Sequence, residues 1–166
     1  MNVTINDKIN LVLRMQLFIV EALGAGDAAE RYAQEARDVL AQVSEREEYR
    51  DIVSDLLTNV GIPQRIRGYA YLVEAITRAA KDPKVMEGVT DGIYSDIATM
   101  YGSTPGAVSR SIRSAVEAAF TNCDYETLGK YFGSSASPEK GRLTNVSFMR
   151  RMAEIARRIH DGRIDA

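Results

Sequence analysis

The stretch from Asp96 to Val116 constrains the fold most, because two helical patterns meet there across a tight turn. The first pattern ends at Gly102, where the absence of a side chain lets the backbone reverse. Thr104 and Pro105 then predict the start of a second helix. Threonine is a favoured N-cap, and proline fits the first helical position because its missing N–H has no partner there anyway. The spacing predicts two helices joined by a sharp turn.

Apolar residues in the second of these helices recur every four positions, at Val108, Ile112 and Val116, so we expect them to face the core. The residues turned outward are then small or basic: Gly106, Ala107, Ser109, Arg110 and Arg113. Small side chains let a helix approach base pairs closely, and a guanidinium can donate two hydrogen bonds to guanine. The pattern favours DNA binding over the alternative, an ordinary pair of helices with solvated arginines.

The composition indicates an all-α protein, a multi-helix bundle that contains this helix-turn-helix. The 166 residues are 45% hydrophobic, and no sustained alternation of apolar and polar residues predicts a strand. The single cysteine, Cys123, cannot form an internal disulfide, and together with the lack of a secretory signal it favours the cytoplasm. The segment from Ile9 to Leu23 is too short and too polar to span a membrane.

No motif in the sequence predicts catalysis. We find no glycine-rich phosphate loop, no paired-carboxylate signature and no spacing typical of metal ligands, and His160 has no partner for nucleophilic chemistry. We therefore expect a protein that is not an enzyme and that has no cofactor and no metal site.

Residues 1–45 predict a separate element at the N-terminus. Helical periodicity runs from Ile5 to Leu23 and again from Asp27 to about Val43, with glycines between them. We expect an antiparallel helical hairpin that dimerises or binds a partner, since two helices cannot bury both apolar faces alone. A charged stretch, Glu45–Arg50, either separates this hairpin from the next helix or continues into it.

Residues 46–166 predict a second domain, the helix-turn-helix effector domain. Helical patterns cover residues 52–60, 64–80, 105–120, 125–132 and 145–159, with a short helical turn near 85–89. Net charge is −2 for the whole chain but +3 over residues 101–166. A domain so weakly basic should depend on well-placed contacts or dimerisation for useful DNA affinity.

Four segments resemble the C-terminal effector domain of the stage-zero sporulation protein A family, whose full-length members are master transcription regulators of endospore formation. They are G-I-P-Q-R-I-R-G-Y-A-Y-L-V-E-A-I over residues 61–76, Y-S-D-I-A from Tyr94, S-R-S-I-R-S-A-V-E-A-A-F over 109–120, and L-T-N-V-S-F-M over 143–149. The similarity covers roughly residues 46–166. The family normally carries an α/β receiver domain before the effector domain, and residues 1–45 do not resemble one, so control by aspartate phosphorylation is not implied.

The resemblance implies a six-helix effector domain that binds short boxes of double-stranded DNA, with the helix over residues 105–120 in the major groove. Arg110 falls on the family's guanine-reading arginine. Arg113 falls on another basic position of the same helix, where it would hold a base or a phosphate, and Ser109 is a further expected base contact. The phosphate contacts that we expect are Thr104, Arg65 and four residues around the start of the last helix: Lys140, Arg142, Thr144 and Asn145. For Arg65 and its neighbour Arg67, a solvated position is the alternative.

Residues 125–133 align with the region through which the family touches the sigma subunit of RNA polymerase. Asp124, Glu126 and Lys130 are the charges that would make this contact, and an ordinary solvated helix is the alternative. The chain has Ala107 and Ser109 where the family has an arginine and a glutamate, so we expect the operator to differ.

The sequence thus predicts a homodimeric, sequence-specific transcription regulator that binds DNA. The alternative is a protein–protein interaction module, or an antagonist of a related regulator or of RNA polymerase, that does not read DNA.

Overall fold

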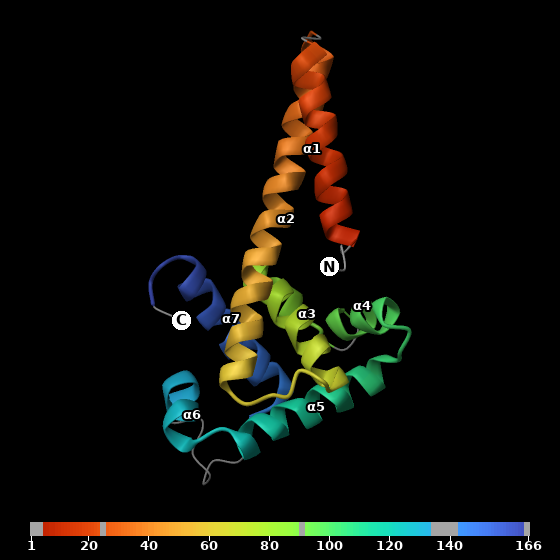
Figure 1. Cartoon of the computed structure of the whole chain (residues 1–166). Helices are drawn as coiled ribbons and strands as arrows, with labels where there is room; N and C mark the ends of the chain where they lie inside the picture. The colour runs from red at the N-terminus through yellow and green to blue at the C-terminus, as the bar shows by residue number, and fades with distance from the viewer. Residues whose placement is uncertain (1–4, 24–25, 90–91, 134–142, 165–166) are drawn as a thin grey trace. The chain divides into compact units, whose positions relative to one another are not determined.

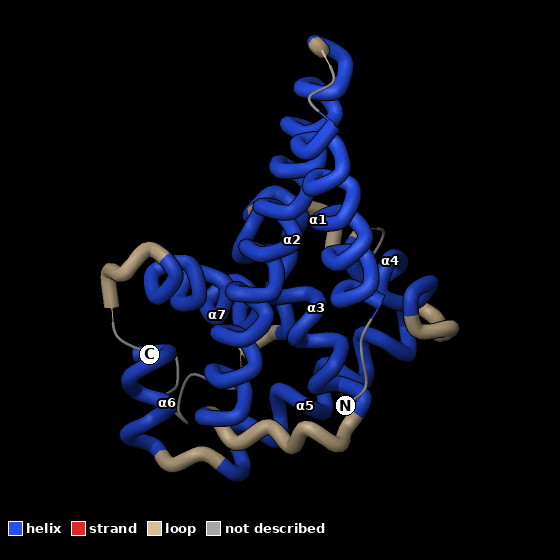
Figure 2. The backbone as a smooth tube through the Cα atoms, turned by 45° about the horizontal axis from the view of Figure 1, so that its top comes forward, coloured by secondary structure: helices blue, strands red, loops and turns tan. Residues whose placement is uncertain are grey.

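The computed structural model describes residues 5–23, 26–89, 92–133 and 143–164. Helices account for the regular structure in all four ranges, and no strand occurs in them (Figure 2). The prediction of an all-α fold is confirmed. The helices are α1 (Ile5–Leu23), α2 (Asp27–Asn59), α3 (Arg67–Lys81), the 3-10 helix η1 (Pro83–Met86), α4 (Ile93–Met100), α5 (Pro105–Asn122), α6 (Tyr125–Phe132) and α7 (Asn145–His160).

Helix α2 decides between the two interpretations of the charged stretch Glu45–Arg50. It runs without interruption from Asp27 to Asn59, so the stretch continues the helix and does not separate two helices. Glutamate and arginine are good helix formers, and neither glycine nor proline occurs between Asp27 and Asn59. The expected end near Val43 was therefore wrong.

The chain divides into two compact units, residues 1–47 and residues 48–166, with the division inside α2. Unit 1 contains α1 and about the first two thirds of α2. Its two helices are joined by an ion pair, in which Arg37 Nη1 lies 3.1 Å from Glu21 Oε1. Ala33 is buried in this unit, but much of the apolar surface of α1 is exposed.

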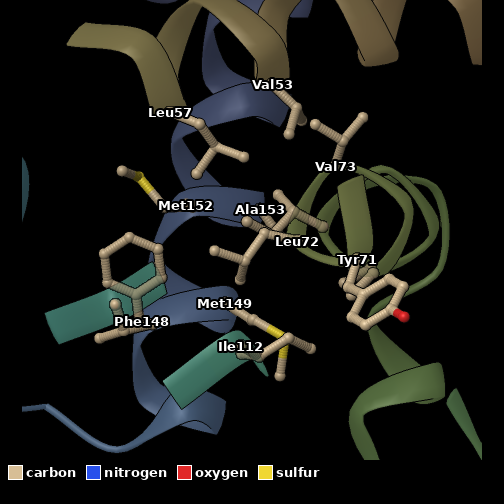
Figure 3. Close-up of a cluster of buried hydrophobic side chains, with 14 of the residues drawn as sticks. Val53, Leu57, Tyr71, Leu72, Val73, Ile112, Phe148, Met149, Met152 and Ala153 are labelled. Atoms are coloured by element: carbon tan, nitrogen blue, oxygen red, sulfur yellow. The ribbon is translucent and has the colours of Figure 1, made fainter. Parts of the chain in front are cut away.

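Unit 2 holds the hydrophobic core, with α3 at its centre. Figure 3 shows side chains from four helices meeting around Leu72: Val53 and Leu57 of α2, Ile112 of α5, and Phe148, Met149 and Met152 of α7. Ten of the fifteen residues of α3 are buried, which shows that this helix is covered on several sides. Among the described helices, none is long and apolar enough to cross a membrane.

Close packing of α3 on α5 depends on Gly68. A Cβ atom at this position would overlap the carbonyl oxygen of Ser111 and would lie 2.8 Å from the Cβ atom of Ala115. The missing side chain therefore lets the start of α3 approach the middle of α5, which fixes α5 against the core.

Candidate nucleic-acid interface

The turn between α4 and α5 has the geometry that Gly102 predicts. Gly102 has a φ of 58°, in the left-handed region. Ser103 N donates to Ala98 O at 2.7 Å, and Gly102 N donates to Thr99 O at 3.4 Å, the two hydrogen bonds of a Schellman motif. The chain thus ends α4 and reverses into α5 within the turn at residues 101–104 (Figure 1).

The start of α5 follows the sequence pattern as well. Thr104 Oγ1 accepts a hydrogen bond from Ala107 N at 3.3 Å, and Pro105 is the first residue of the helix. Three side chains are buried as expected: Val108, Ile112 and Val116. This burial turns the small and basic residues of α5 away from the core.

Arg110 is the long side chain that projects from this outward face. It is exposed, and no described residue forms a hydrogen bond or an ion pair with it. A Cβ atom added at Gly106 would meet Arg110 Nη1 at 3.6 Å, so the guanidinium lies over the first turn of α5. The glycine leaves room for it there, next to the helix N-terminus.

Arg113, one turn later, is bonded to the protein itself. Its Nε donates to Glu117 Oε1 at 3.0 Å, and its Nη1 donates to Leu143 O at 3.2 Å. The side chain is 43% exposed. Arg113 therefore attaches the segment before α7 to α5 while part of its guanidinium stays accessible.

Asn145, the first residue of α7, joins three helices. Its Nδ2 donates to Ser109 O of α5 at 3.0 Å and to the hydroxyl oxygen of Tyr94 of α4 at 3.4 Å. Burial raises the pKa of Tyr94, against the lowering effect of the hydrogen bonds with Asn145 and Ser109. Sequence reasoning treated Asn145 as a phosphate contact and did not find this link, which joins residues 36 positions apart.

The start of α7 lies against the first half of α5 because of these two links. Thr144 is exposed and caps α7: its Oγ1 accepts from Ser147 N at 3.1 Å. The first turn of a helix carries partial positive charge and unpaired N–H groups, so it can hold a phosphate. Two of the expected phosphate contacts, Lys140 and Arg142, lie outside the described residues.

Arg65 is exposed in the turn before α3, and within the described part of the chain no residue pairs with it. This turn is held against the end of α5, because Asn122 Nδ2 donates to Gly61 O at 3.0 Å. Arg67, at the first position of α3, is also exposed. Both arginines therefore lie near α5. No sequence motif predicted the contact between Asn122 and Gly61.

The charges of α6 lie on the surface. Asp124 caps this helix, with Oδ1 accepting from Thr127 N at 2.9 Å, and the hydrogen bonds from Thr127 lower the pKa of Asp124. Glu126 and Lys130 form an exposed ion pair at 3.6 Å. All three side chains are accessible to a partner.

Comparison with known families identifies what this arrangement belongs to. Residues 53–156 match the family described as sporulation initiation factor Spo0A C terminal. The chain belongs to this family. The match runs from the second half of α2 into α7 and includes the turn, α5 and the start of α7.

The family consists of DNA-binding effector domains of a sporulation regulator and is not a family of enzymes. The resemblance inferred from the sequence is therefore confirmed. The match leaves out α1 and most of α2, and the described residues of that segment are helical, unlike the alternating strands and helices of a receiver domain.

Proposed function

We propose that the protein is a sequence-specific transcription regulator that places α5 in the major groove of DNA. The observation that carries this proposal is the state of Arg110, which is exposed, is not bonded to any described residue and lies over Gly106. Gly106 and Ala107 beside it are small enough for a close approach to base edges. In this position, the guanidinium donates to O6 and N7 of a guanine.

Ser109 and Arg113 flank Arg110 on the same helix and complete the reading surface. Both are attached to the start of α7, Ser109 through its carbonyl group and Arg113 through Leu143. We propose that Arg113 uses its remaining N–H groups for a base or a phosphate, and that Ser109 contacts the base next to the one read by Arg110.

Backbone contacts come from the helix N-termini around α5. Thr104 and Thr144 present hydroxyl groups at the starts of α5 and α7, and Asn145 holds the two helices in register. We propose that the two threonines, with Lys140, Arg142 and Arg65, bind phosphates and set the orientation of the domain, while Asn145 positions the start of α7 for these contacts.

Selection from random duplexes tests the proposal, followed by Arg110→Ala on the enriched site. We expect this substitution to cost about 1–3 kcal/mol on the enriched site and to relax the preference for one base. Arg163→Ala is the matched control, because Arg163 is an exposed arginine just after the C-terminal end of α7. Equal losses on enriched and scrambled duplexes would exclude Arg110 as the base-reading residue.

We also propose two protein partners for the regulator. The exposed charges of α6, Asp124, Glu126 and Lys130, fit a contact with the sigma subunit of RNA polymerase. Glu126→Lys should then reduce activated transcription in vitro and leave DNA affinity unchanged. The second partner is another copy of the chain, bound through residues 1–45, which increases affinity for paired boxes.

An interaction module that does not read DNA is the second candidate. It is favoured by the two hydrogen bonds that Arg113 donates to Glu117 and to Leu143, which leave Arg110 as the arginine of α5 without a protein partner among the described residues. This candidate would be supported if selection from random duplexes enriches no sequence and if the chain binds DNA only weakly, with binding lost as the salt concentration rises.

A further inference from the structure

Helix α1 has apolar residues on two opposite sides. Leu13, Leu17 and Val20 are half-buried and line the side toward α2. The opposite side is open: five large apolar side chains there are between 51% and 71% exposed, namely Leu11, Val12, Met15, Phe18 and Ile19. At roughly 100° per residue, these five form one continuous stripe about 120° wide, which we call the outer stripe.

A groove borders the outer stripe. It has a volume of about 450 Å³, and Ile19 lies on the edge that it shares with the stripe. On the far side of the groove, α2 contributes Tyr32 and Val39, which are 68% and 37% exposed. Unit 1 therefore presents an apolar surface that extends across both of its helices.

The size of this surface suits a stable association. Its seven exposed large side chains would bury roughly 500 Å² per copy, more than half of the about 800 Å² per partner of a standard interface. Residues that line the groove add to this area when a side chain enters it. Soluble monomers rarely leave so much contiguous apolar surface open.

The charges beside the outer stripe indicate which partner covers it. Arg14 and Glu21 are both exposed, and their spacing of two helical turns places them on the same flank of the stripe. Glu21 pairs with Arg37 of α2 but its side chain is still 57% exposed, so it can also meet a cation of a second chain. Residues 5–23 contain two basic and two acidic side chains, so α1 has no net charge that would repel an identical helix. A strongly acidic or strongly basic partner would find no matching surface on this helix.

We propose that a second copy of the chain covers the outer stripe, with the two α1 helices antiparallel across a two-fold axis near residues 17 and 18. In an antiparallel pair each flank meets the same flank of the other helix, so Arg14 lies beside Glu21 of the partner subunit, and the pair occurs twice. A parallel pair would bring Arg14 to the opposite flank. The inference rests on the homodimer proposed above and assigns its surface and direction.

The first test measures the mass of the full-length chain in solution without DNA, by sedimentation equilibrium. We expect a dimer that becomes a monomer with Phe18→Asp, whereas the dimer persists with Tyr125→Asp, which changes an aromatic residue of similar exposure on α6. Met15→Lys repeats the test in case Phe18→Asp loses helix content by circular dichroism. A monomeric wild type, a larger assembly, or a dimer that survives both substitutions overturns the inference.

The second test uses the charges. Arg14→Glu should raise the dimer dissociation constant about tenfold. A triple variant, Arg14→Glu with Glu21→Arg and Arg37→Glu, keeps the ion pair between α1 and α2 with its charges reversed and should restore most of the loss. No change with Arg14→Glu, or no rescue by the triple variant, overturns the antiparallel arrangement. The duplex selection tests DNA reading separately. A monomer that enriches a sequence would overturn only the dimer, and a dimer that enriches none would overturn only the proposed DNA reading.

Discussion

Two glycines of unit 2 are required for different physical reasons. At Gly68 a side chain has no space, because a Cβ atom would overlap the Ser111 carbonyl oxygen. At Gly102 space is available, since a Cβ atom there would meet nothing within 4 Å, but the φ of 58° strains any residue with a side chain. Gly68 therefore positions α5 against the core, and Gly102 directs the chain from α4 into α5.

Alanine substitutions at these glycines should differ in size. We expect Gly68→Ala to lower the free energy of unfolding by about 2–3 kcal/mol, because backbone must move. Gly102→Ala should cost about 1 kcal/mol through strain alone. Gly129→Ala, inside α6 with open space around it, is the control and should be neutral or stabilising by up to about 1 kcal/mol. Chemical denaturation of the three variants measures these values, and a Gly68→Ala protein as stable as wild type would contradict the packing.

Substitution of Asn145 tests whether this residue positions the interface or contacts DNA directly. Removal of its hydrogen bonds to Ser109 and Tyr94 by Asn145→Ala should lower the free energy of unfolding by about 1–2 kcal/mol. The same substitution should weaken binding to all duplexes, because α7 is no longer held against α5. A direct phosphate contact would instead leave the free energy of unfolding unchanged. It would reduce the slope of log binding constant against log salt concentration by about one. Thr144→Ala provides the comparison, as the side chain of Thr144 forms its hydrogen bonds with Ser147 at the start of α7.

At the scale of helices, local signals in the sequence predicted most boundaries. The ends of α1 and α6 and the N-caps of α5 and α7 follow from glycine, proline and threonine at fixed offsets. The charged stretch within α2 was ambiguous, since charged residues fit both an exposed helix and a linker. The links from Asn145 to Ser109 and from Arg113 to Leu143 could not be predicted, because they join residues 36 and 30 positions apart. Periodicity can show which way a side chain faces, but not which distant carbonyl group it meets.

The carboxylate of Asp124, which caps the N-terminus of α6, should make the free energy of unfolding depend on pH. The pKa of Asp124 is lowered in the folded protein from an ordinary value of 3.8, so its contribution is present above that value and is lost as the pH falls through the lower folded pKa. Asp124→Asn keeps a good cap but has no charge to lose. Wild type should therefore lose more stability than Asp124→Asn between pH 5 and the acid limit of folding, as thermal unfolding at a series of pH values would measure. Parallel curves for the two proteins would show that the carboxylate does not stabilise α6.

At the scale of the molecule, the two units differ in what holds them together. The core cluster of the described residues lies between Tyr49 and Ile164, so it belongs entirely to unit 2. Among the residues of unit 1 whose burial is described, Ala33 is the buried apolar residue, and large apolar side chains of both helices are exposed. The family match begins only at residue 53, so sequence similarity and packing place the start of the C-terminal unit at different residues.

Two truncations that differ by five residues should separate these boundaries. Residues 48–166 keep Tyr49, whose ring is stacked on His160 at 4.2 Å between centroids, and Arg50, which lies 3.6 Å from the buried carboxylate of Glu74. Residues 53–166 lose both contacts although they contain the whole family match. We expect the longer fragment to unfold cooperatively and to bind a single DNA box. The shorter fragment should be less stable by about 2–4 kcal/mol, because a buried ring and one partner of a buried charge are removed.

Denaturant titrations of both fragments measure this difference. Equal stability would show that α2 contributes nothing to unit 2 before residue 53, and a longer fragment that fails to unfold cooperatively would show that the first half of α2 belongs to the same folding unit.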